Sequence, residues 1–593
     1  MELRNNYRRF AIIGGGPSGM FMFKRLIESG LENLDITIYE ASESLGKGMP
    51  YSHTGANHEH ITNVSDNEIP ALVTSVEDWL HSAPTEVLKA FDITPAKFNE
   101  YKVLPRLFFG EYLSAQFELL IKLATKKKIK VQVHLNTPVE DVSDNMISEK
   151  VTVTAGESTT VFDAVIICTG HNWPLKNEGK IPGYFDSPYP PSKLARQVNF
   201  PVAIKGASLT AIDAVRTLAR SNGSFYKNKD GMLCYKVHEN SEGFKIVLHS
   251  KDGLLPAVRF HLEDSHLSNE SMLTSDALKK HMQQNDGFVS LDYLFEWNFK
   301  EPIRKHDPAF YDEIKDMTLE AFVESMMDMR ENIDAFNLLK AEYTEAEQSI
   351  KRRQSVYWKE MLAVLSFAMN YPAKHLSAED MLRLKKVLMP LISIVIAFVP
   401  QSSCREIIAL HDAGVLSLIA VDEKSDAKPH DEEGAVYHYD HNGEKSETHY
   451  RMFVDCVGQP HLSIKDFPFE SLVKNGTLSP ARIRFRSEEE GRNAMQNGNK
   501  QVEADAGGAY FLQVPGITID DQFRAVDMYG AVNDRVYIMA VPYIGGYNPD
   551  YSGLDFGEAA SEKIMTGIEN AHRKANVDGQ LSPDHLSTAS GLK

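Results

Sequence analysis

Cysteine is scarce in this sequence, which has four cysteines among 593 residues. They form no CxxC pair and have no histidine at metal-ligand spacing, so neither a metal site nor a disulfide framework is predicted. Disulfide reduction is also disfavoured, because that chemistry needs two reactive cysteines close together. We interpret all four, Cys168, Cys234, Cys404 and Cys456, as small buried side chains.

Basic charge and long apolar runs are lacking as well. The formal net charge is -19 and the pI is near 5.6, which disfavours nucleic acid as a partner. The most apolar segment, residues 391–399, is too short to span a bilayer and is expected to be a buried helix or strand. Glycines interrupt the N-terminal apolar run too early for a signal peptide. We therefore expect a cytoplasmic protein without nucleic-acid or membrane partners, and a homo-oligomer is an open alternative.

A glycine-rich turn follows the first apolar run. Residues 10–13 predict a strand, and apolar residues at helical spacing from Met20 predict a helix. The glycines between them match GxGxxG, and the next predicted strand, residues 35–39, ends at an acid suited to the ribose hydroxyls. This order predicts an FAD site made by Gly14, Gly16, Pro17, Ser18, Gly19 and Glu40.

A second strand–turn–helix unit begins near residue 201. Before it, residues 161–168 predict a strand that runs into Thr169 and Gly170, which we assign to the flavin site. The second turn keeps only its first glycine, although the replacing residues are small enough for a phosphate to approach the helix N-terminus. A unit that no longer binds nucleotide is the alternative. The predicted contacts are Gly206, Ser208, Leu209 and Thr210.

The strand that follows this helix indicates the coenzyme. Residues 244–248 predict a strand that ends in His249, Ser250 and Lys251, with no acid at its end for a 2′-hydroxyl. A hydroxyl and a cation at Ser250 and Lys251 suit a 2′-phosphate, so NADPH is preferred over NADH. A solvated surface role for Lys251 is nearly as good an interpretation.

The chain is expected to return to the flavin domain near its end. Residues 454–458 resemble a second crossover, and residues 535–541 predict a strand that enters Gly545 and Gly546. The helix expected from about Phe556 would direct its N-terminal amides at the pyrimidine edge of the flavin.

These elements predict an α/β fold of two nested Rossmann-like dinucleotide-binding domains with a helical insertion. Within the insertion, apolar residues between Met317 and Met329 have helical spacing, and the polar segment 422–447 is expected to be an exposed loop or hairpin. The expected parts are an FAD-binding domain (1–200), an NAD(P)H-binding domain (201–264), the insertion (265–400), the rest of the NAD(P)H-binding domain (401–460) and the rest of the FAD-binding domain (461–593).

Five further motifs resemble a known family. They are LGKGMPYS (45–52), HITNV (60–64), LPRLFFGEYL (104–113), KGASLTAID (205–213) and GGYNPDYSGLDF (545–556). With the N-terminal fingerprint, the chain resembles the FAD/NAD(P)-binding flavoproteins that include FAD-dependent urate hydroxylase and aspartate N-monooxygenases. The resemblance implies that Gly48, Tyr51, Asn63 and Val64 pass near the flavin and that Arg106 lies by the FAD phosphates or the cavity. From the residues alone, Arg106 could equally be a structural ion-pair residue.

The resemblance and the two units together predict an FAD-dependent, NADPH-using monooxygenase of a small polar substrate and O₂. N-hydroxylation of an amino acid or amine by a C4a-hydroperoxyflavin is one form of that reaction. A dehydrogenase or oxidase without oxygen insertion and a non-catalytic cofactor-binding protein are the alternatives. No catalytic residue is evident, and the candidates are Asn63, Arg106 and Arg259. Either arginine could clamp a substrate carboxylate, and Arg259 could instead contact an NADPH phosphate.

Overall fold

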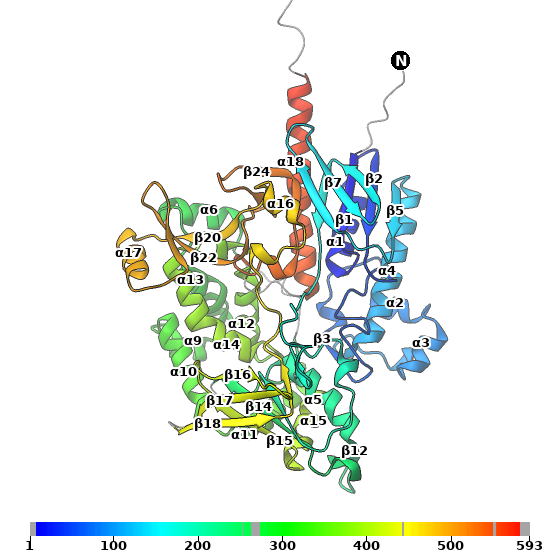
Figure 1. Ribbon diagram of the computed structural model, residues 1–593, viewed down its shortest axis with the longest axis vertical. Helices are drawn as coiled ribbons and strands as arrows, with labels where there is room; N and C mark the ends of the chain where they lie inside the picture. Colours follow the sequence, from blue (N-terminus) through cyan, green and yellow to red (C-terminus); the bar gives the residue numbers. More distant parts are fainter. Residues whose placement is uncertain (1–7, 252, 263–272, 442–443, 549–552, 581–593) are drawn as a thin grey trace, which may run out of the picture.

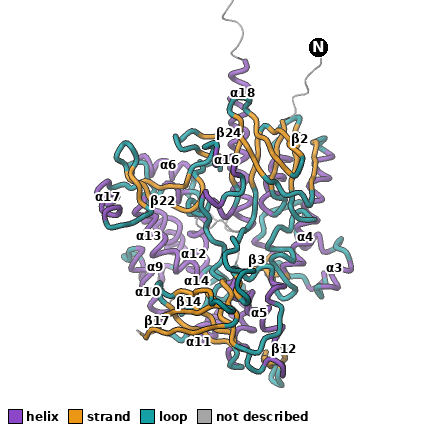
Figure 2. The backbone as a smooth tube through the Cα atoms, viewed as in Figure 1, coloured by secondary structure: helices purple, strands orange, loops and turns teal. Residues whose placement is uncertain are grey.

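The computed structural model describes residues 8–251, 253–262, 273–441, 444–548 and 553–580. Two strand-rich parts lie at opposite ends of the molecule, and most of the helices form a third part beside them (Figure 2). The long C-terminal helix α18 stands between the first sheet and the helical part (Figure 1). The predicted α/β class with parallel sheets and a helical region is confirmed.

The first sheet has six strands in the order β23-β24-β9-β1-β2-β5. All neighbours are parallel except β23 and β24. The inner strands β2 and β9 are fully buried because helices cover the sheet, as parallel strands require. Their bounds are β1 (Arg8–Ile13), β2 (Leu34–Tyr39), β5 (Lys130–His134), β9 (Ala164–Ile167), β23 (Arg524–Val526) and β24 (Val532–Ile538).

Helices α1 (Pro17–Glu28), α4 (Arg106–Lys126) and α18 (Gly553–Gln580) pack around this sheet, with α1 between the other two. Gly557 lets α18 approach α1, because a Cβ there would lie 2.9 Å from Phe21. The predicted helix near Phe556 thus begins earlier, at Gly553.

The predicted strand 161–168 is wrong as one element. It is divided into β8 (Ser158–Phe162) and β9, which belong to different sheets. Asp163 stands at the division, where its carboxylate accepts a hydrogen bond from the Arg9 amide at 2.7 Å. Strand β8 continues an antiparallel sheet with β6 (Asp141–Asn145) and β7 (Lys150–Ala155).

The second sheet is fully parallel, in the order β10-β19-β11-β14-β15. Helices α5 (Leu209–Asn222) and α15 (Gln401–Asp412) pack against it and against each other. Its strand bounds are β10 (Tyr184–Phe185), β11 (Pro201–Lys205), β14 (Lys245–Lys251), β15 (Leu416–Val421) and β19 (Met452–Asp455). A hairpin, β12 (Gly223–Lys227) and β13 (Leu233–Val237), follows α5.

Two predicted strand bounds and one loop need correction. Strand β14 runs three residues past Leu248, because β15 continues to pair with it as far as Lys251. Strand β24 ends at Ile538, and Val541 begins a short 3-10 helix. The polar segment 422–447 is neither a loop nor a single hairpin. Its described residues form an antiparallel ribbon of β16 (Asp426–Pro429), β17 (Ala435–His441) and β18 (Glu444–Tyr450).

The described residues between 273 and 400 are mainly helical. The apolar stripe at 317–329 forms α10, which begins at Leu319 because Thr318 caps it, and Met329 is exposed instead of buried. The segment 391–399 contains the buried end of α14 and no strand, apart from an isolated bridge at Val399. The helices are α6 (Ser275–Gln284), α7 (Leu291–Phe295), α8 (Glu301–His306), α9 (Pro308–Ile314), α10 (Leu319–Glu331), α11 (Ala335–Arg352), α12 (Tyr357–Ala368), α13 (Ala378–Arg383) and α14 (Met389–Val395).

These helices pack into two hydrophobic core clusters, one with each of the two parallel sheets. One core cluster joins the first sheet to most of the helices, whereas Phe336 and Leu339 of α11 pack into the core of the second sheet. A small antiparallel sheet also contributes to the first core cluster. Its strands are β20 (Pro480–Arg484), β21 (Val502–Ala504) and β22 (Tyr510–Ile517). In the described part of the chain, no helix has both the length and the apolar character needed to cross a membrane.

Six other short strands and α-helices complete the set of these elements in the described residues. They are β3 (Ile61–Ser65), β4 (Val103–Pro105), α2 (Val76–Leu80), α3 (Thr85–Ala90), α16 (Glu470–Lys474) and α17 (Glu488–Gln496).

Candidate functional site: two glycine cradles

The first predicted fingerprint forms a tight cradle between β1 and α1. Gly14 has φ +102°, and a Cβ there would lie 2.6 Å from the carbonyl oxygen of Cys168, the residue after β9. At Gly19 a Cβ would lie 2.0 Å from the Gly14 carbonyl oxygen. These two positions therefore need glycine for backbone packing alone. At Gly16, the N-cap of α1, a Cβ would lie 3.2 Å from Cα of Gly48.

Two features of this cradle suit a phosphate-bearing ligand. No side chain caps the first turn of α1, and none of its first-turn residues is acidic, so its amide groups stay available to an anion. The Thr169 hydroxyl oxygen, just beyond β9, is buried and has no hydrogen-bond partner among the described residues. A buried polar atom without a partner is costly, which favours a ligand atom there. Gly170 has no neighbour within 4 Å of its virtual Cβ.

Glu40 stands at the end of β2, as its spacing predicts. Its Oε2 accepts a hydrogen bond from the Gly15 amide at 2.7 Å, and its Oε1 accepts one from the Ser42 amide at 2.8 Å. A carboxylate offers about four acceptor positions, so two remain for hydroxyl groups.

The loop of residues 45–51 closes one side of this cradle. A Cβ on Gly48 would lie 2.9 Å from Cδ of Pro17, and Gly46 donates a hydrogen bond to the Gly15 carbonyl at 2.7 Å. The structure thus brings Gly48 to Gly16 and Pro17, far apart in sequence. Tyr51 packs edge-on against Phe109 at 5.1 Å, and burial raises the pKa of its phenol.

The second cradle repeats the first in detail. Gly206 has φ +104°, and a Cβ there would lie 2.8 Å from the carbonyl oxygen of Cys456, the residue after β19. The N-cap Ser208 has φ -82° and ψ -167°, close to the values of -75° and -166° at Gly16. Again no side chain caps the first turn, which contains Leu209 and Thr210. Ala211 replaces the third glycine and is fully buried, so this unit accommodates one methyl group.

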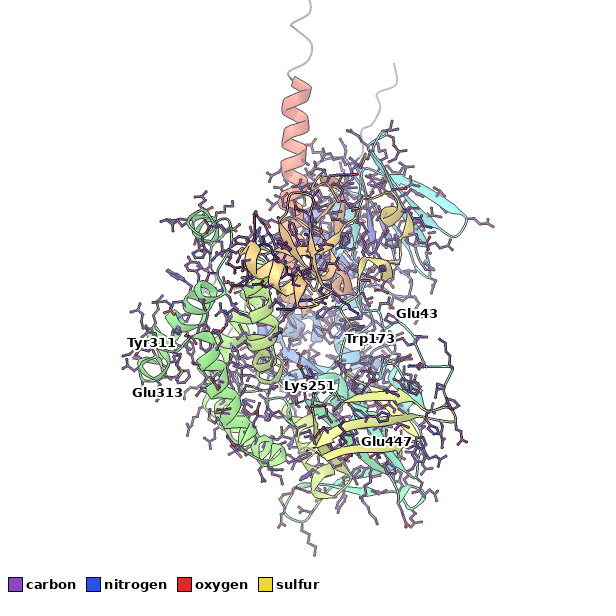
Figure 3. The ribbon with its side chains drawn as sticks, turned by 60° about the vertical axis from the view of Figure 1, so that its left-hand side comes forward. Glu43, Trp173, Lys251, Tyr311, Glu313 and Glu447 are labelled. Carbon is purple, nitrogen blue, oxygen red and sulfur yellow. The ribbon has the colours of Figure 1, made fainter. Side chains whose placement is uncertain are left out.

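The strand end that faces the second cradle has no acid. Register places Ser250 where Glu40 stands in the first unit, since Lys205 pairs with His249 as Ile13 pairs with Tyr39. The Ser250 hydroxyl donates to the carbonyls of Lys251 and Leu254 at 3.0 and 3.1 Å. The Lys251 side chain is 64% exposed, and its Nζ lies 3.4 Å from Oε1 of Glu423, which is 90% exposed. Figure 3 shows Lys251 in the lower part of the molecule, with Trp173 above it.

Arg106 does not point into open space. At the start of α4 its Nη1 lies 2.6 Å from Oδ2 of Asp213 on α5, and its Nε donates to the Ile61 carbonyl at 3.1 Å. The Tyr189 hydroxyl donates to the same carboxylate at 2.9 Å. Burial opposes the charge, but Asp213 and Tyr189 together raise the pKa of Arg106 above its usual range. Of the two alternatives for Arg106, the geometry is that of a structural ion pair between the two nucleotide-binding units.

His60 completes this contact between the units. Its Nδ1 accepts a hydrogen bond from the Asn57 amide at 3.0 Å, and its Nε2 lies 3.2 Å from the Asp213 carbonyl oxygen. Burial lowers the pKa of the ring, so it stays neutral near pH 7. These partners are those of a satisfied structural histidine.

Arg259, the other candidate clamp, is also engaged. Its guanidinium contacts the Glu68 carboxylate and the Asn63 carbonyl, and it donates to the Ser65 hydroxyl at 2.9 Å. Both side chains of this ion pair are buried, with 6% and 8% of their surface exposed. The predicted role as a clamp for substrate or NADPH is therefore not one that the geometry favours. Asn63 is exposed and Val64 half-buried, both on β3.

The glycines before α18 have a packing role. A Cβ on Gly546 would lie 2.1 Å from the Pro515 carbonyl oxygen, so β22 crosses directly beneath this turn. Gly545 is buried beside it. Residues 549–552, which would connect this turn to α18, lie outside the described residues.

Sequence reasoning missed the hydrogen bonds between residues 172–173 and 458–459, which join the two crossovers. The chain passes from the first unit to the second after β9 and returns after β19. Gln459 accepts a hydrogen bond from the Asn172 amide at 2.8 Å and donates one to its carbonyl at 2.6 Å. Trp173 Nε1 donates to the Gly458 carbonyl at 3.0 Å. Only the repeated strand-end pattern at 168–170 and 456–458 hinted that these segments correspond.

Comparisons with known proteins agree with this architecture. Residues 11–172 match a family model described as FAD-NAD(P)-binding, and residues 274–396 match one described as a YdhS-like middle domain. The uncharacterized protein YdhS of Escherichia coli (strain K12) is 25% identical over 581 residues, which is 96% of this chain and 100% of that protein.

Among solved structures, similarity is low in sequence and extends over nearly the whole chain. The FAD-bound cadaverine monooxygenase DfoA of Erwinia amylovora is 10% identical with a TM-score of 0.45, over 98% of this chain and 97% of its own. The ornithine hydroxylase PvdA of Pseudomonas aeruginosa is 9% identical with a TM-score of 0.44, over 95% and 99%.

The family match over 11–172 covers the first cradle, Glu40 and the loop that closes it. The N-terminal part of this chain therefore matches an FAD-NAD(P)-binding domain, as its motifs predict.

Proposed function

We propose that this protein is an FAD-dependent, NADPH-using monooxygenase of a small polar substrate, with N-hydroxylation of an amine or amino acid as the favoured reaction. The observation that carries the proposal is the presence of two cradles of nearly identical geometry, at Gly14 and Gly206. One cradle suits FAD and the other suits a nicotinamide coenzyme. An oxidase that is reduced by its own substrate would need only the first.

The chain's own residues would bind and orient the two nucleotides. The first-turn amides of α1 would hold the FAD pyrophosphate, and Glu40 would accept hydrogen bonds from the ribose. The Thr169 hydroxyl would gain the partner it lacks. Bound FAD would accept a hydride from NADPH and activate O₂, so that one oxygen atom enters the substrate and the other leaves as water. The protein's part is to keep the site closed to water and the substrate close to the flavin.

Disulfide reduction is a poorer alternative. The four cysteines are all free, and Cys168 and Cys456 lie one in each unit, at the two crossovers. Burial raises the pKa of both thiols, which disfavours the reactive thiolate.

The decisive experiment separates oxygen insertion from simple oxidation. The purified protein is expected to show a flavin absorption band that NADPH bleaches under argon. With ¹⁸O₂ and a panel of amines and amino acids, the label is expected in an N-hydroxylated product. If every substrate yields only hydrogen peroxide and no labelled product, the oxidase or dehydrogenase alternative replaces this proposal. A protein that binds no flavin would favour a non-catalytic role.

The flavin site itself is tested by Gly16→Glu, whose carboxylate would meet the pyrophosphate at the N-terminus of α1. Loss of the flavin band is expected, with the circular dichroism spectrum retained. The control is Gly30→Asn, at an exposed turn with no neighbour within 4 Å of the virtual Cβ. Full flavin content in Gly16→Glu would contradict the assignment.

The choice of coenzyme is tested by Lys251→Ala. We infer that this exposed ammonium contacts the 2′-phosphate, so the ratio of flavin reduction rates with NADPH and NADH should fall about tenfold, as the loss of one charge-assisted contact predicts. Lys229→Ala, at an exposed turn of the β12–β13 hairpin, is the control. Equal rates with both coenzymes in the unmodified protein would contradict the preference for NADPH.

A further inference from the structure

A cavity of about 610 Å³ lies on the face of α18 that is turned away from α1. Its other walls are α6, the end of α12, the 3-10 helix η7 (Pro372–His375) and the turn at 521–523. Figure 1 shows α18 between the first sheet and these green helices. The volume lies in the range of small-molecule sites, and the cavity shares no lining residue with either glycine cradle.

Most of the cavity wall is apolar. Phe367, Phe523 and Phe556 line it from three different segments, with Leu278 and Leu294 from the helical part. Phe523 and Phe556 contact each other edge-on at 5.9 Å. Such walls suit the hydrocarbon or aromatic body of a ligand, since apolar surface removed from water stabilises binding.

Two of the three lysines that line the cavity, Lys374 and Lys563, have their ammonium groups over the Tyr371 ring. Lys374 has a partner, because its Nζ lies 3.0 Å from Oδ1 of Asp521 and donates to the Asp520 carbonyl at 2.7 Å. Asp521 also accepts a hydrogen bond from the Tyr371 hydroxyl at 2.8 Å and lies 2.9 Å from Nε2 of His375. Three groups therefore already share this one carboxylate.

Lys563, on α18, is the lysine without a carboxylate. Its Nζ lies 3.8 Å from the centre of the Tyr371 ring, and no acidic side chain of the described residues is within 4.0 Å of it. Burial and the charge of Lys374 lower the pKa of Lys563, and the charges of Asp521 and Glu562 oppose this only in part. An ammonium that is half-buried beside a second ammonium is stabilised by an anion that enters the cavity.

We propose that this cavity binds a small organic acid, with its carboxylate on the ammonium of Lys563 and its apolar body against the phenylalanine walls. The site goes beyond the monooxygenase proposal and does not depend on it, because the cavity and its charges exist whichever reaction the flavin performs. Lys563 is the group that distinguishes an acid from a neutral compound. Lys374 keeps the carboxylate of Asp521, which also contacts Tyr371 and His375, in place beside it.

The test uses two fluorescent probes that differ only in charge. 8-Anilinonaphthalene-1-sulfonate is anionic, and N-phenyl-1-naphthylamine is the same ring system without the sulfonate. Each probe is titrated into the flavin-saturated protein with NADP⁺ present. The variant Lys563→Met is expected to bind the anionic probe about tenfold more weakly than the unmodified protein does. Its affinity for the neutral probe is expected to change less than twofold. Lys563→Arg should restore the anionic probe. Lys122→Met, on the exposed surface of α4, is the control.

Two further measurements distinguish a loss of binding from a folding defect and identify the class of anion that binds. Ala560→Phe, which fills the cavity, should weaken both probes while flavin absorbance is retained. Decanoate should displace the anionic probe at least tenfold better than decanol, and better than decyl phosphate, in the unmodified protein. Unchanged affinity for the anionic probe in Lys563→Met, equal loss of both probes in that variant, or equal displacement by decanoate and decanol would each overturn the proposal. Better displacement by decyl phosphate would overturn the assignment to a carboxylic acid.

Discussion

The carboxylate of Asp213 lies 2.6 Å from the guanidinium of Arg106, so α5 of the second nucleotide-binding unit is tied directly to α4 of the first. The contact is largely enclosed, with 7% of the Asp213 side chain and 17% of the Arg106 side chain exposed. Burial alone would raise the pKa of Asp213, but the charge of Arg106 and the hydrogen bonds from Tyr189 and Arg106 lower it below its ordinary value. An ion pair of this kind holds the two units in one relative orientation.

Removal of either partner should be costly. Arg106→Met leaves a buried carboxylate without its cation and should lower the free energy of unfolding by about 3–5 kcal/mol, measured by urea denaturation. The double variant Arg106→Met with Asp213→Leu should lose less than Arg106→Met alone, because no unpaired charge remains. An additive loss in the double variant would show that the pair is not coupled. Lys340→Met, which breaks the exposed pair with Asp412, should leave the urea midpoint unchanged.

His249 should make the protein less stable as the pH falls. Its ring is stacked on Tyr437 with centroids 3.9 Å apart, and burial lowers its pKa to about 4. The unfolded chain binds a proton at this histidine below about pH 6.5, whereas the folded protein does not until about pH 4. The free energy of unfolding therefore falls across this window, by roughly 3 kcal/mol at most from this group.

The variant His249→Phe keeps the stacked ring and removes the titration. Its unfolding free energy should vary less between pH 6.5 and 4 than that of the unmodified protein, as followed by denaturation at a series of pH values. His238→Phe, at an exposed position, should retain the original slope. An identical pH dependence in His249→Phe and the unmodified protein would contradict the expectation.

Gly206→Ala should affect both folding and coenzyme binding. The new Cβ would adopt φ +104° and lie 2.8 Å from the Cys456 carbonyl, so a loss of roughly 1–3 kcal/mol in stability is expected together with weaker NADPH binding. Gly231→Ala is the matched control, since its φ of +79° is also positive but nothing lies within 4 Å. Calorimetric titration with NADPH should show weaker binding only for Gly206→Ala; equal affinity in both variants would argue against a nucleotide at this cradle.

The thiols should differ sharply in reactivity. Cys168, Cys404 and Cys456 are buried, and burial raises the pKa of each, whereas Cys234 is partly exposed on β13. Iodoacetamide should therefore label Cys234 first in the native protein and all four thiols after unfolding, as peptide mass spectrometry would report. Rapid native labelling of Cys168 or Cys456 would indicate that a crossover opens.

The sequence by itself determined the two strand–turn–helix units. Each depends on a short apolar run, a glycine that must have positive φ and a helix with an apolar face, all within about thirty residues. Local order of this kind is visible in the chain, which is why Gly14, Gly206 and the FAD/NAD(P)-binding family could be predicted. The resemblance also named Gly48, which packs against the first cradle. The prediction of one strand from 161 to 168 was wrong because a mostly apolar run does not reveal that Asp163 separates strands of two different sheets.

Only the tertiary structure decided what the charged residues do. The sequence left the roles of Arg106 and Arg259 open, because their partners Asp213 and Glu68 are separated from them by more than a hundred residues. The same holds for Lys563, which meets Tyr371 and Lys374 only because α18 packs beside the helical part. An ion pair or a cavity is set by positions in space, and the free energy of a charge depends on its burial and neighbours, which local sequence patterns do not contain.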